Sequence, residues 1–458
     1  MLNRRHFLMS LLTVAAAEAI SPAISFAEAT AKGQKRRIPW SNWSGSQSCL
    51  PEFRTAPATV AELQEIITSA TGVVRPVGSG HSFSALVPTD DVLISLGRLS
   101  GLISHDAEKL QATLYGGTRL GAIGQPLEDI GQAMINMPDI DQQSLAGCLA
   151  TATHGTGAGI GCMPTTVKGL ELVTANGDIL QCSDDENPEI FQAAKVSMGA
   201  LGVVTKATIQ NEAPYRLKRE TVWREFDEIM EVAESMADNN RNFEFYYIPF
   251  TGMGWTDVHN YTNEPIASTD RLDTNDGAND LKLARDLLSW SPALRELILS
   301  TYMKTIDDEV VIESSWKNYA SDRNVRFNEM EYHLPRENGL KALKEIRDVL
   351  ENNFPEVFFP FECRYVKSDD IWMSPFYQRE TFSIAVHRFF EEDYQDFFKA
   401  IEPILKKYHG RPHWGKLNTL TAQDFSKLYP KWNEFKAIRK ELDPNGKFLN
   451  PYLKSLFT

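Results

Sequence analysis

The stretch RPVGSGHSFSA (75–85) places a histidine, His81, at the tip of a glycine-rich loop that follows a short apolar run. Such a loop after a strand is typical of a phosphate-binding turn, because glycines let the backbone approach a ligand closely. A dinucleotide-binding GxGxxG loop needs a third glycine for close helix–strand packing, and Phe83 occupies that position. The sequence also lacks the GKS or GKT of a Walker loop, so both common nucleotide folds are disfavoured.

A second loop rich in small residues is QQSLAGCLATATHGTGAG (142–159), which also contains a histidine, His154. Its small side chains allow main-chain N–H groups to donate to an anion such as a pyrophosphate. A pair of tight turns would have the same composition. Two such loops, each beside a histidine, favour a cofactor site over turns alone.

The composition indicates a globular, acidic protein. Its 458 residues are enough for two or three domains. The 61 acidic side chains outnumber the 47 lysines and arginines, which gives a net charge of −14 and disfavours nucleic acids and anionic membranes as partners. Five cysteines without a CxxC pair predict mostly buried thiols and no metal site, and their spacing leaves any disulfide pairing open.

Residues 1–27 have the pattern of an export signal. Arg4 and Arg5 precede an apolar run from Phe7 to Ile20, and Ser25–Ala27 is a suitable cleavage site. The segment resembles a bacterial twin-arginine signal, which predicts a periplasmic or secreted protein. A short membrane anchor is the alternative, but the run is shorter than the about 20 residues that cross a bilayer. No later segment is long and apolar enough, so we expect no membrane span after processing.

Residues 39–212 alternate short apolar runs with glycine-rich turns, which predicts an α+β domain rich in strands. A helix is expected to begin at residue 60 and to end with a C-cap at Gly72. Residues 168–180 predict a hairpin that turns at Asn176-Gly177. Further strands are expected over 73–78, 91–99, 112–117 and 201–210.

Beyond Pro214 the pattern changes to strands with interleaved helices, which predicts a sheet with helices on one face. The expected strands are 243–250, 326–334 and 381–390, and the expected amphipathic helices are 340–352 and 395–408. Residues 255–300 are polar and acidic and then helical, so we interpret them as a surface insertion.

Six segments together resemble the vanillyl-alcohol-oxidase-type (PCMH-type) flavoproteins. Those similar to the FAD domain are VGSGHSFS (77–84), LAGCLATATHGTG (145–157) and GALGVVTKATI (199–209). Those similar to the aldonolactone and alditol oxidase branch are FECR (361–364), RPHWGK (411–416) and GKFLNPYL (446–453). The resemblance covers nearly all of the chain after the export signal.

The resemblance implies an α+β fold with a two-part FAD-binding domain over 39–212. A substrate (cap) domain over 213–440 would follow, with a mixed or antiparallel sheet covered by helices. The C-terminal segment, 441–458, would return to the FAD domain.

The resemblance also implies FAD as the cofactor, bonded covalently through a ring nitrogen of His81 to the 8α-methyl carbon of the flavin. Glycines around the histidine give its ring clearance, and the bond prevents loss of the cofactor outside the cell. His154 would lie near the cofactor in a structural role. The cofactor-binding residues implied, besides His81, are Gly78, Ser79, Gly80, Ser82, Ser144, Gly147, Thr151, His154, Gly155, Gly157, Gly202 and Val203.

The candidate catalytic residues lie in the second half of the chain. Glu362 and Arg364 alternate along an apparent strand and face the same way, where they can accept from and donate to sugar hydroxyls. By residue type alone, a surface ion pair explains them too. Lys416 resembles the family lysine that contacts the substrate oxygen and the flavin, and it is a candidate proton acceptor. His387 is either a buried core histidine or, as the resemblance implies, a residue near the substrate.

These features predict an exported FAD-dependent oxidoreductase that oxidises a CH–OH group of an aldono-1,4-lactone, of the D-arabinono- or L-gulono-lactone type, by hydride transfer to flavin N5. An alditol oxidase is the first alternative, which Phe389 disfavours because some relatives have a small polar residue there. A non-catalytic flavin- or sugar-binding protein is the second. The expected partners are a sugar lactone or polyol and either oxygen or a redox protein as electron acceptor; the oligomeric state stays open.

Overall fold

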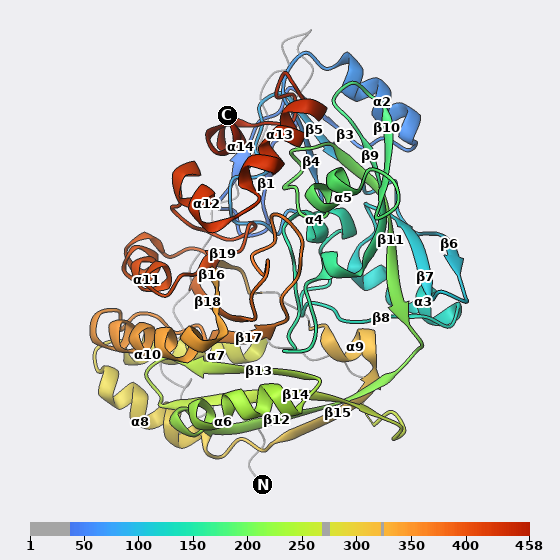
Figure 1. Cartoon of the computed structure of the whole chain (residues 1–458). Helices are drawn as coiled ribbons and strands as arrows, with labels where there is room; N and C mark the ends of the chain where they lie inside the picture. Colours follow the sequence, from blue (N-terminus) through green and yellow to red (C-terminus); the bar gives the residue numbers. More distant parts are fainter. Residues whose placement is uncertain (1–36, 268–274, 322–324) are drawn as a thin grey trace, which may run out of the picture. The chain divides into compact units, whose positions relative to one another are not determined.

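The computed structural model describes residues 37–267, 275–321 and 325–458 (Figure 1). The export signal expected over residues 1–27 lies outside the described residues. Residues Arg37–Thr458 form one compact unit, whose strands are arranged in sheets of two, three, six and eight. The smallest sheet pairs β1 (Trp40–Ser41) with β2 (Ser48–Cys49).

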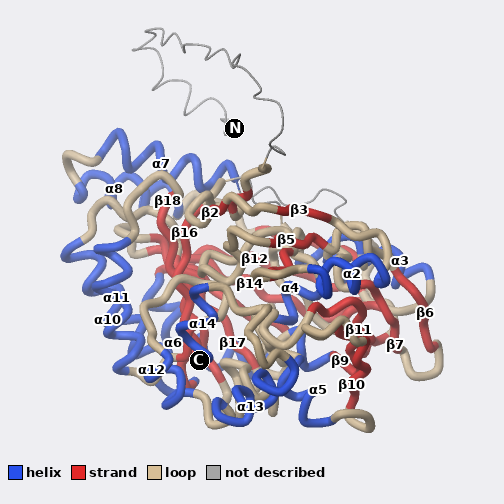
Figure 2. The backbone as a smooth tube through the Cα atoms, turned by 90° about the horizontal axis from the view of Figure 1, so that it is seen from above, coloured by secondary structure: helices blue, strands red, loops and turns tan. Residues whose placement is uncertain are grey.

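The first half of the chain builds two of the larger sheets. One is parallel, in the order β3-β5-β4, and the other is antiparallel, in the order β10-β9-β11-β7-β6 with β8 beside β11. Figure 2 shows β11, β7 and β6 of the second sheet side by side. The predicted hairpin between β9 and β10 is confirmed, and Gly177 adopts the positive φ of +84° that its turn requires. The strands are β3 (Phe53–Thr55), β4 (Val74–Val77), β5 (Val92–Ser95), β6 (Leu102–Asp106), β7 (Gln111–Tyr115), β8 (Ala133–Met134), β9 (Val167–Val173), β10 (Ile179–Ser183) and β11 (Val203–Glu212).

Short helices connect these strands. They are α2 (Val60–Ser69), η1 (Leu120–Ala122), α3 (Gly124–Asp129), α4 (Leu145–Ala150), η2 (Met163–Thr166) and α5 (Pro188–Ala194). The C-cap expected at Gly72 is wrong, because α2 ends earlier and Ala70 caps it in an extended conformation. A glycine is needed at position 72 for a different reason. A Cβ there would lie 2.5 Å from the carboxyl carbon of Asp91, whose carboxylate accepts from the Val73 N–H at 2.7 Å.

The second half of the chain builds the eight-stranded sheet, in the order β15-β12-β14-β13-β17-β18-β16-β19, and every neighbouring pair in it is antiparallel. The strands are β12 (Arg216–Glu225), β13 (Asn242–Ile248), β14 (Met253–Thr262), β15 (Glu309–Ser314), β16 (Phe327–Pro335), β17 (Phe361–Val366), β18 (Thr381–Phe389) and β19 (Arg411–Pro412).

Amphipathic helices cover one face of this sheet, as the sequence predicts. In α6 (Phe226–Asn239), Ile229, Ala233 and Ala237 recur at four-residue intervals and are buried against β12, β13 and β14. Helix α10 (Arg336–Asn353) packs on β16 and β18, beside α11 (Gln395–Lys407). The remaining helices are α7 (Asn275–Leu288), α8 (Pro292–Met303), α9 (Ser315–Tyr319), α12 (Ala422–Leu428), α13 (Trp432–Leu442) and α14 (Pro451–Phe457).

The interpretation of residues 255–300 as a surface insertion is wrong for their first part. Strand β14 lies inside the sheet, between β12 and β13. Its sequence is polar because one face carries side chains that form hydrogen bonds within the fold. Trp255 Nε1 donates to Asp257 at 3.0 Å, and His259 Nδ1 lies 2.7 Å from the side-chain oxygen of Asn318.

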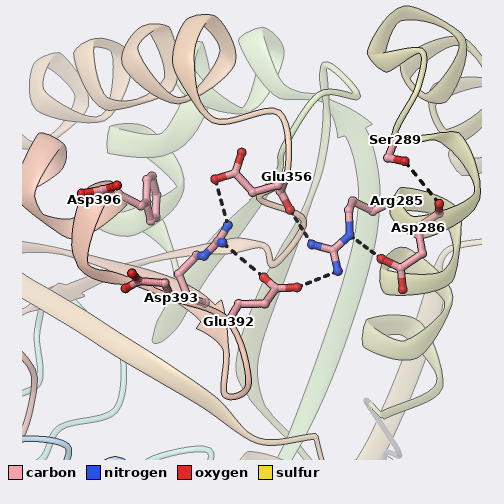
Figure 3. A pocket seen from close by; sticks show the side chains of 9 residues that line it. Arg285, Asp286, Ser289, Glu356, Glu392, Asp393 and Asp396 are labelled. Carbon is pink, nitrogen blue, oxygen red and sulfur yellow. Dashed lines mark hydrogen bonds and ion pairs between the residues drawn. The ribbon is translucent and has the colours of Figure 1, made fainter.

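Helix α7, in the later part of this segment, is fixed by buried charges. Arg285 donates to the carbonyl oxygen of Glu356 at 2.8 Å and to the carboxylate of Glu392 at 2.6 Å (Figure 3). Arg388 lies 3.3 Å from the other oxygen of Glu392. The polar pocket that these residues line is therefore an ion-pair network that attaches α7 to the end of β18.

The C-terminal residues 441–458 contact the strand and loop of the opening motif. The Val74 N–H donates to the Lys447 carbonyl at 2.8 Å, and the buried Arg75 donates to the Phe448 carbonyl at 2.6 Å. Asn450 donates to the Ala85 carbonyl at 2.9 Å. The contacts tie the chain's end to β4, while the domain boundaries expected at 212, 213 and 440 stay predictions.

The cysteines are free thiols, and all except Cys49 are buried. This result confirms the prediction of mostly buried thiols. Within the described ranges, no helix combines the length and the apolar character needed to cross a membrane.

Candidate active site

The loop after β4 presents main-chain N–H groups that the described chain leaves free. From Ser79 to Ser82, these N–H groups form no hydrogen bond with a described residue. Gly78 approaches the second loop so closely that a Cβ on it would lie 2.1 Å from the Ser144 hydroxyl oxygen. Consecutive free N–H groups in a tight turn form an anion-binding concavity, so this loop fits a pyrophosphate.

In the second loop (142–159), Ser144 is the N-cap residue of α4. A Cβ on Gly155 would lie 2.3 Å from the Met137 carbonyl oxygen, so only glycine fits at this position. The Gly157 N–H donates to the Tyr365 carbonyl at 2.8 Å, which attaches the loop to β17. The other predicted cofactor residues of this loop are Gly147 within α4 and Thr151 at its C-cap.

Gly202 and Val203, at the start of β11, pack closely against β9. A Cβ on Gly202 would lie 2.8 Å from the Val173 carbonyl oxygen, and Val203 pairs with Val173 of β9. Close packing of β11 on β9 therefore accounts for this glycine, and a role of the two residues in binding the cofactor stays a prediction.

The His81 ring is mostly buried and chemically available. It stacks on Trp43 with 5.4 Å between ring centroids, and no described residue forms a hydrogen bond with either ring nitrogen. Burial, together with the positive charges of Lys416 and Arg119, lowers the pKa of His81 to about 4. The ring is therefore neutral at neutral pH, and one of its nitrogens has a free lone pair that can act as a nucleophile.

The GHS and HWGK motifs, from distant parts of the chain, meet in the structure. The Phe83 N–H donates to the Gly415 carbonyl at 2.7 Å, and the Ser84 hydroxyl donates to the Trp414 carbonyl at 2.7 Å. The Lys416 ammonium lies 5.1 Å from the centroid of the Phe83 ring. Backbone hydrogen bonds thus hold Lys416 beside the loop that carries His81.

One face of the eight-stranded sheet collects the other predicted catalytic residues. Glu362 and Arg364 alternate along β17, so both side chains lie on this face. Each is only 6% exposed, which excludes a surface ion pair. His387 of β18 lies directly opposite Glu329 of β16 in the antiparallel register. The structure thus brings together the predicted catalytic residues and adds acidic partners to them.

Sequence reasoning missed those acidic partners on β16. Glu329, Glu331 and His333 occupy every second position of the strand and are all buried. Their alternation with apolar residues was visible in RFNEMEYHL (326–334). Two carboxylates on a buried strand require cationic partners, and that requirement was the signal for a site.

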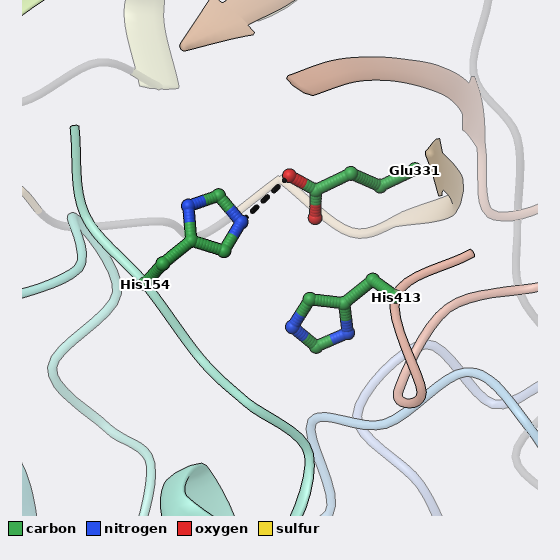
Figure 4. Close-up of side chains that lie close together, drawn as sticks. All are labelled: His154, Glu331 and His413. Carbon is green, nitrogen blue, oxygen red and sulfur yellow. Dashed lines mark hydrogen bonds and ion pairs between the residues drawn. The ribbon is translucent and has the colours of Figure 1, made fainter. Parts of the chain in front are cut away.

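Glu331 connects Arg364 to His154. Its Oε1 accepts from Arg364 Nη2 at 2.8 Å and lies 3.0 Å from His154 Nε2 (Figure 4). Burial alone would raise the pKa of Glu331, but the charges of Arg364 and His154 hold it well below its usual range. Burial likewise opposes the charge on Arg364, yet Glu362 and Glu331 raise its pKa well above its ordinary value. Arg364 and Glu331 therefore form a charged, buried pair.

His154, Glu331 and His413 lie close enough to hold a metal ion by distance alone (Figure 4). Their hydrogen bonds do not suit one. His413 Nδ1 accepts from the Gly415 N–H at 3.0 Å, so the neutral ring carries its hydrogen on the nitrogen that a metal would need. The Glu331 oxygen is already shared with Arg364, whose positive charge opposes a cation nearby. The cluster is better suited to hydrogen bonding than to a metal.

Glu362 is linked to a second acid through a phenol. The Tyr246 hydroxyl lies 3.0 Å from both Glu362 and Glu244, and Arg364 Nη2 lies 3.6 Å from Glu362. Burial, together with the carboxylates of Glu362 and Asp257, raises the pKa of Glu244 to about 8. A phenol has one hydrogen to donate, so a protonated Glu244 can donate to Tyr246 while Tyr246 donates to Glu362.

Lys416 has a partner that is distant in the sequence. Its ammonium is ion-paired with Oε2 of Glu329, and Oε1 of the same carboxylate lies 3.8 Å from His387 Nε2. His387 Nδ1 lies 3.0 Å from the Pro360 carbonyl oxygen. One buried carboxylate therefore faces both the lysine and the histidine that the sequence singles out.

Comparison with known proteins shows which family shares this architecture. A model of the D-arabinono-1,4-lactone oxidase family matches residues 207–456, and a model of the FAD binding domain matches residues 51–183. The L-gulono-1,4-lactone dehydrogenase of Mycobacterium tuberculosis (strain CDC 1551 / Oshkosh) is 35% identical over 91% of this chain and 98% of its own. The L-gulonolactone oxidase of Bos taurus is 32% identical over 92% of this chain and 98% of its own.

Solved structures share the fold. A solvent-stable cholesterol oxidase has a TM-score of 0.77 at 20% identity and covers 92% of this chain and 98% of its own. Fold and matches together define a PCMH-type FAD-linked oxidoreductase that acts on CH–OH groups, with FAD as its cofactor. The chain belongs to the D-arabinono-1,4-lactone oxidase family, which confirms the predicted fold class and family.

Proposed function

We propose that this enzyme oxidises a secondary CH–OH group of an aldono-1,4-lactone, with hydride transfer to flavin N5. The observation that carries the proposal is the meeting of Lys416 with the His81 loop, on the sheet face that holds Glu362 and Arg364. Relatives named for L-gulono- and D-arabinono-lactones support this substrate class.

The loops of the first half of the chain are proposed to hold FAD. The free N–H groups from Ser79 to Ser82 would donate to the pyrophosphate, beside Ser144. The neutral, unpartnered His81 ring is the proposed site of a covalent bond to the flavin. When bound, the flavin supplies the two-electron acceptor for the substrate hydride.

The sheet face is proposed to bind and polarise the sugar. Arg364 Nη1 forms no hydrogen bond to a described residue, so it is a donor available to a substrate or flavin oxygen. Glu362, which lies 3.6 Å from Arg364 Nη2 and accepts from the Tyr246 hydroxyl, is an acceptor for a sugar hydroxyl. Lys416 adds a second positive charge where negative charge develops on the substrate oxygen and the reduced flavin.

An alditol oxidase is the second candidate. The alditol oxidase of a Streptomyces species is 27% identical to this chain over 91% of its length. Phe389 lies two residues after His387 on the same face of β18, where a phenyl ring offers no hydrogen bond to a linear polyol. We therefore favour the lactone. A non-catalytic binding protein is disfavoured, because such a protein has no need of three buried or half-buried charges at one site.

Steady-state turnover tests the substrate class. The purified holoenzyme should oxidise L-gulono- or D-arabinono-1,4-lactone at least tenfold more efficiently, by kcat/KM, than xylitol or sorbitol. Oxygen and an artificial acceptor should be compared in parallel, because relatives are named both oxidases and dehydrogenases. A preference for the polyols would favour the alditol oxidase, and no turnover of any sugar would contradict both.

Export by the twin-arginine route is proposed from the sequence. Arg4 and Arg5 precede the apolar run, and this route carries folded proteins, which agrees with loading of the flavin before export. Replacing both arginines by lysine should leave the precursor in the cytoplasm. Unchanged export of that variant would point to a different signal.

A further inference from the structure

We infer that His387 is the general base of the reaction, and that Glu329 positions it. This inference rests on the proposed function and deepens it by naming the group that takes the substrate hydroxyl proton. His387 lies on the same sheet face as Glu362 and Arg364. It is 9% exposed, so its ring is nearly buried but still accessible to a small molecule.

Hydrogen bonding fixes the tautomer of His387. Nδ1 lies 3.0 Å from the Pro360 carbonyl oxygen, which can only accept, so Nδ1 carries the hydrogen. The neutral ring therefore has its lone pair on Nε2, as a base requires. Phe327 and Phe359 pack on the ring, with centroids 4.8 and 6.2 Å away, and restrict its rotation.

Glu329 completes the arrangement. Its Oε1 lies 3.8 Å from His387 Nε2, and it is 2% exposed. A buried carboxylate at that distance stabilises the imidazolium that forms when Nε2 accepts a proton. The same carboxylate binds the Lys416 ammonium, so one residue orders the base and the cation that faces the developing oxyanion.

The other titratable groups of this face are engaged differently. Glu331 is occupied by Arg364 and His154, and Glu362 accepts from Tyr246. Lys416 donates to Glu329 as an ammonium and has no lone pair in that state. His387 and His333, both on this face, each leave Nε2 without a donor among the described residues, but His333 is completely buried, whereas His387 keeps 9% of its surface exposed.

The step balances as a two-electron oxidation. The substrate O–H bond breaks and its proton goes to His387 Nε2, while the C–H bond breaks and its hydride, with both electrons, leaves to the flavin. The C=O bond forms from the O–H electron pair. His387 then returns the proton to solvent.

Anaerobic stopped-flow reduction tests the base directly. His387→Gln keeps a side chain of similar length but cannot take the proton, so the flavin-reduction rate should fall roughly 10²–10⁴-fold with FAD content unchanged. His387→Ala should be equally slow and should recover with added imidazole. His105→Gln, a substitution in an exposed histidine of β6, is the matched control and should react like wild type.

A readout independent of turnover is the tautomer itself. Nitrogen NMR of the ¹⁵N-histidine-labelled holoenzyme, assigned by the signals lost in His387→Gln, should show Nδ1 protonated and Nε2 bare. Glu329→Gln should slow flavin reduction. Added imidazole should still rescue the double variant that combines Glu329→Gln with His387→Ala, because Glu329 positions the base and does not itself accept the proton.

The inference is overturned by reduction of His387→Gln within threefold of wild type, by the opposite tautomer, or by a slow His387→Ala that imidazole fails to rescue. Failure of the proposed function looks different: wild-type flavin would not be bleached by any lactone or polyol, although the His387 tautomer would be as described.

Discussion

The main-chain N–H of Phe83 donates to the carbonyl oxygen of Gly415 at 2.7 Å, and this bond joins the loop of His81 to the loop of Lys416. Both loops are irregular backbone, which is free to move unless such bonds hold it. The proposed flavin attachment point and the proposed catalytic cation are therefore placed by backbone contacts. A substitution at His81, whose ring has no hydrogen-bond partner among the described residues, should change chemistry more than it changes the fold.

The flavin should be covalently attached. A neutral His81 ring without a hydrogen-bond partner is free to bond the flavin, since its pKa of about 4 lies well below neutral pH. After acid denaturation and gel filtration, the yellow colour should stay with wild-type protein and separate from His81→Ala. Complete release of flavin from wild type would show that no bond forms.

Glu331→Gln should strongly destabilise the protein. The substitution removes the carboxylate that Arg364 contacts at 2.8 Å and His154 at 3.0 Å, and breaking a buried ion pair costs about 3–5 kcal/mol. Chemical denaturation measures the loss. The control is Glu345→Gln, which removes a surface pair with Lys407 and should cost less than about 1 kcal/mol. Equal losses of unfolding free energy for the two substitutions would mean that the buried pair stabilises the fold no more than the surface pair does.

Gly155→Ala and Gly159→Ala should behave differently although they lie in one loop. A Cβ at Gly155 would lie 2.3 Å from the Met137 carbonyl, whereas nothing lies within 4 Å of a Cβ at Gly159. The first change should cost about 1–3 kcal/mol through displaced backbone, and the second should be neutral. Thermal unfolding of the two holoenzymes decides this, and equal melting temperatures would contradict the loop geometry.

Stability should depend on pH through Glu244. Its pKa is raised from 4.5 to about 8, so between these values the folded chain keeps a proton that the unfolded chain has released. Folding stability should therefore fall as pH rises through this window. Glu244→Gln removes the titration and can still donate to Tyr246, so its free energy of unfolding should fall less between pH 5 and 8. Parallel pH profiles of the two proteins would argue against a protonated Glu244.

Local patterns in the sequence predicted the parts of the site that local physics determines. The glycine-rich loops predict that the backbone approaches its neighbours closely. The alternation of side chains along a strand places Glu362 and Arg364 of FECR (361–364) on one face. The hairpin at Asn176-Gly177 follows from the dihedral angles that such a turn requires.

What the sequence could not predict depends on long-range pairing. Lys416 receives its partner Glu329 only because β16 and β19 are neighbours in the sheet. Strand β14 was misread as a surface segment because its polar residues find their partners on other strands and helices. Such pairings are set by tertiary packing, which leaves no trace at short sequence separation.

Anaerobic flavin reduction by an aldono-1,4-lactone tests the proposed function most directly. Wild-type holoenzyme mixed with L-gulono-1,4-lactone without oxygen should lose its visible flavin absorbance in a single substrate-dependent phase. Lys416→Met should bind FAD but melt below wild type, because the buried Glu329 loses its cationic partner. Its flavin should also be reduced roughly 10²–10³-fold more slowly, since the variant lacks a charge at the developing anion. Wild-type flavin that stays oxidised with every lactone offered, or a Lys416→Met reduced within threefold of wild type, would contradict the site described here.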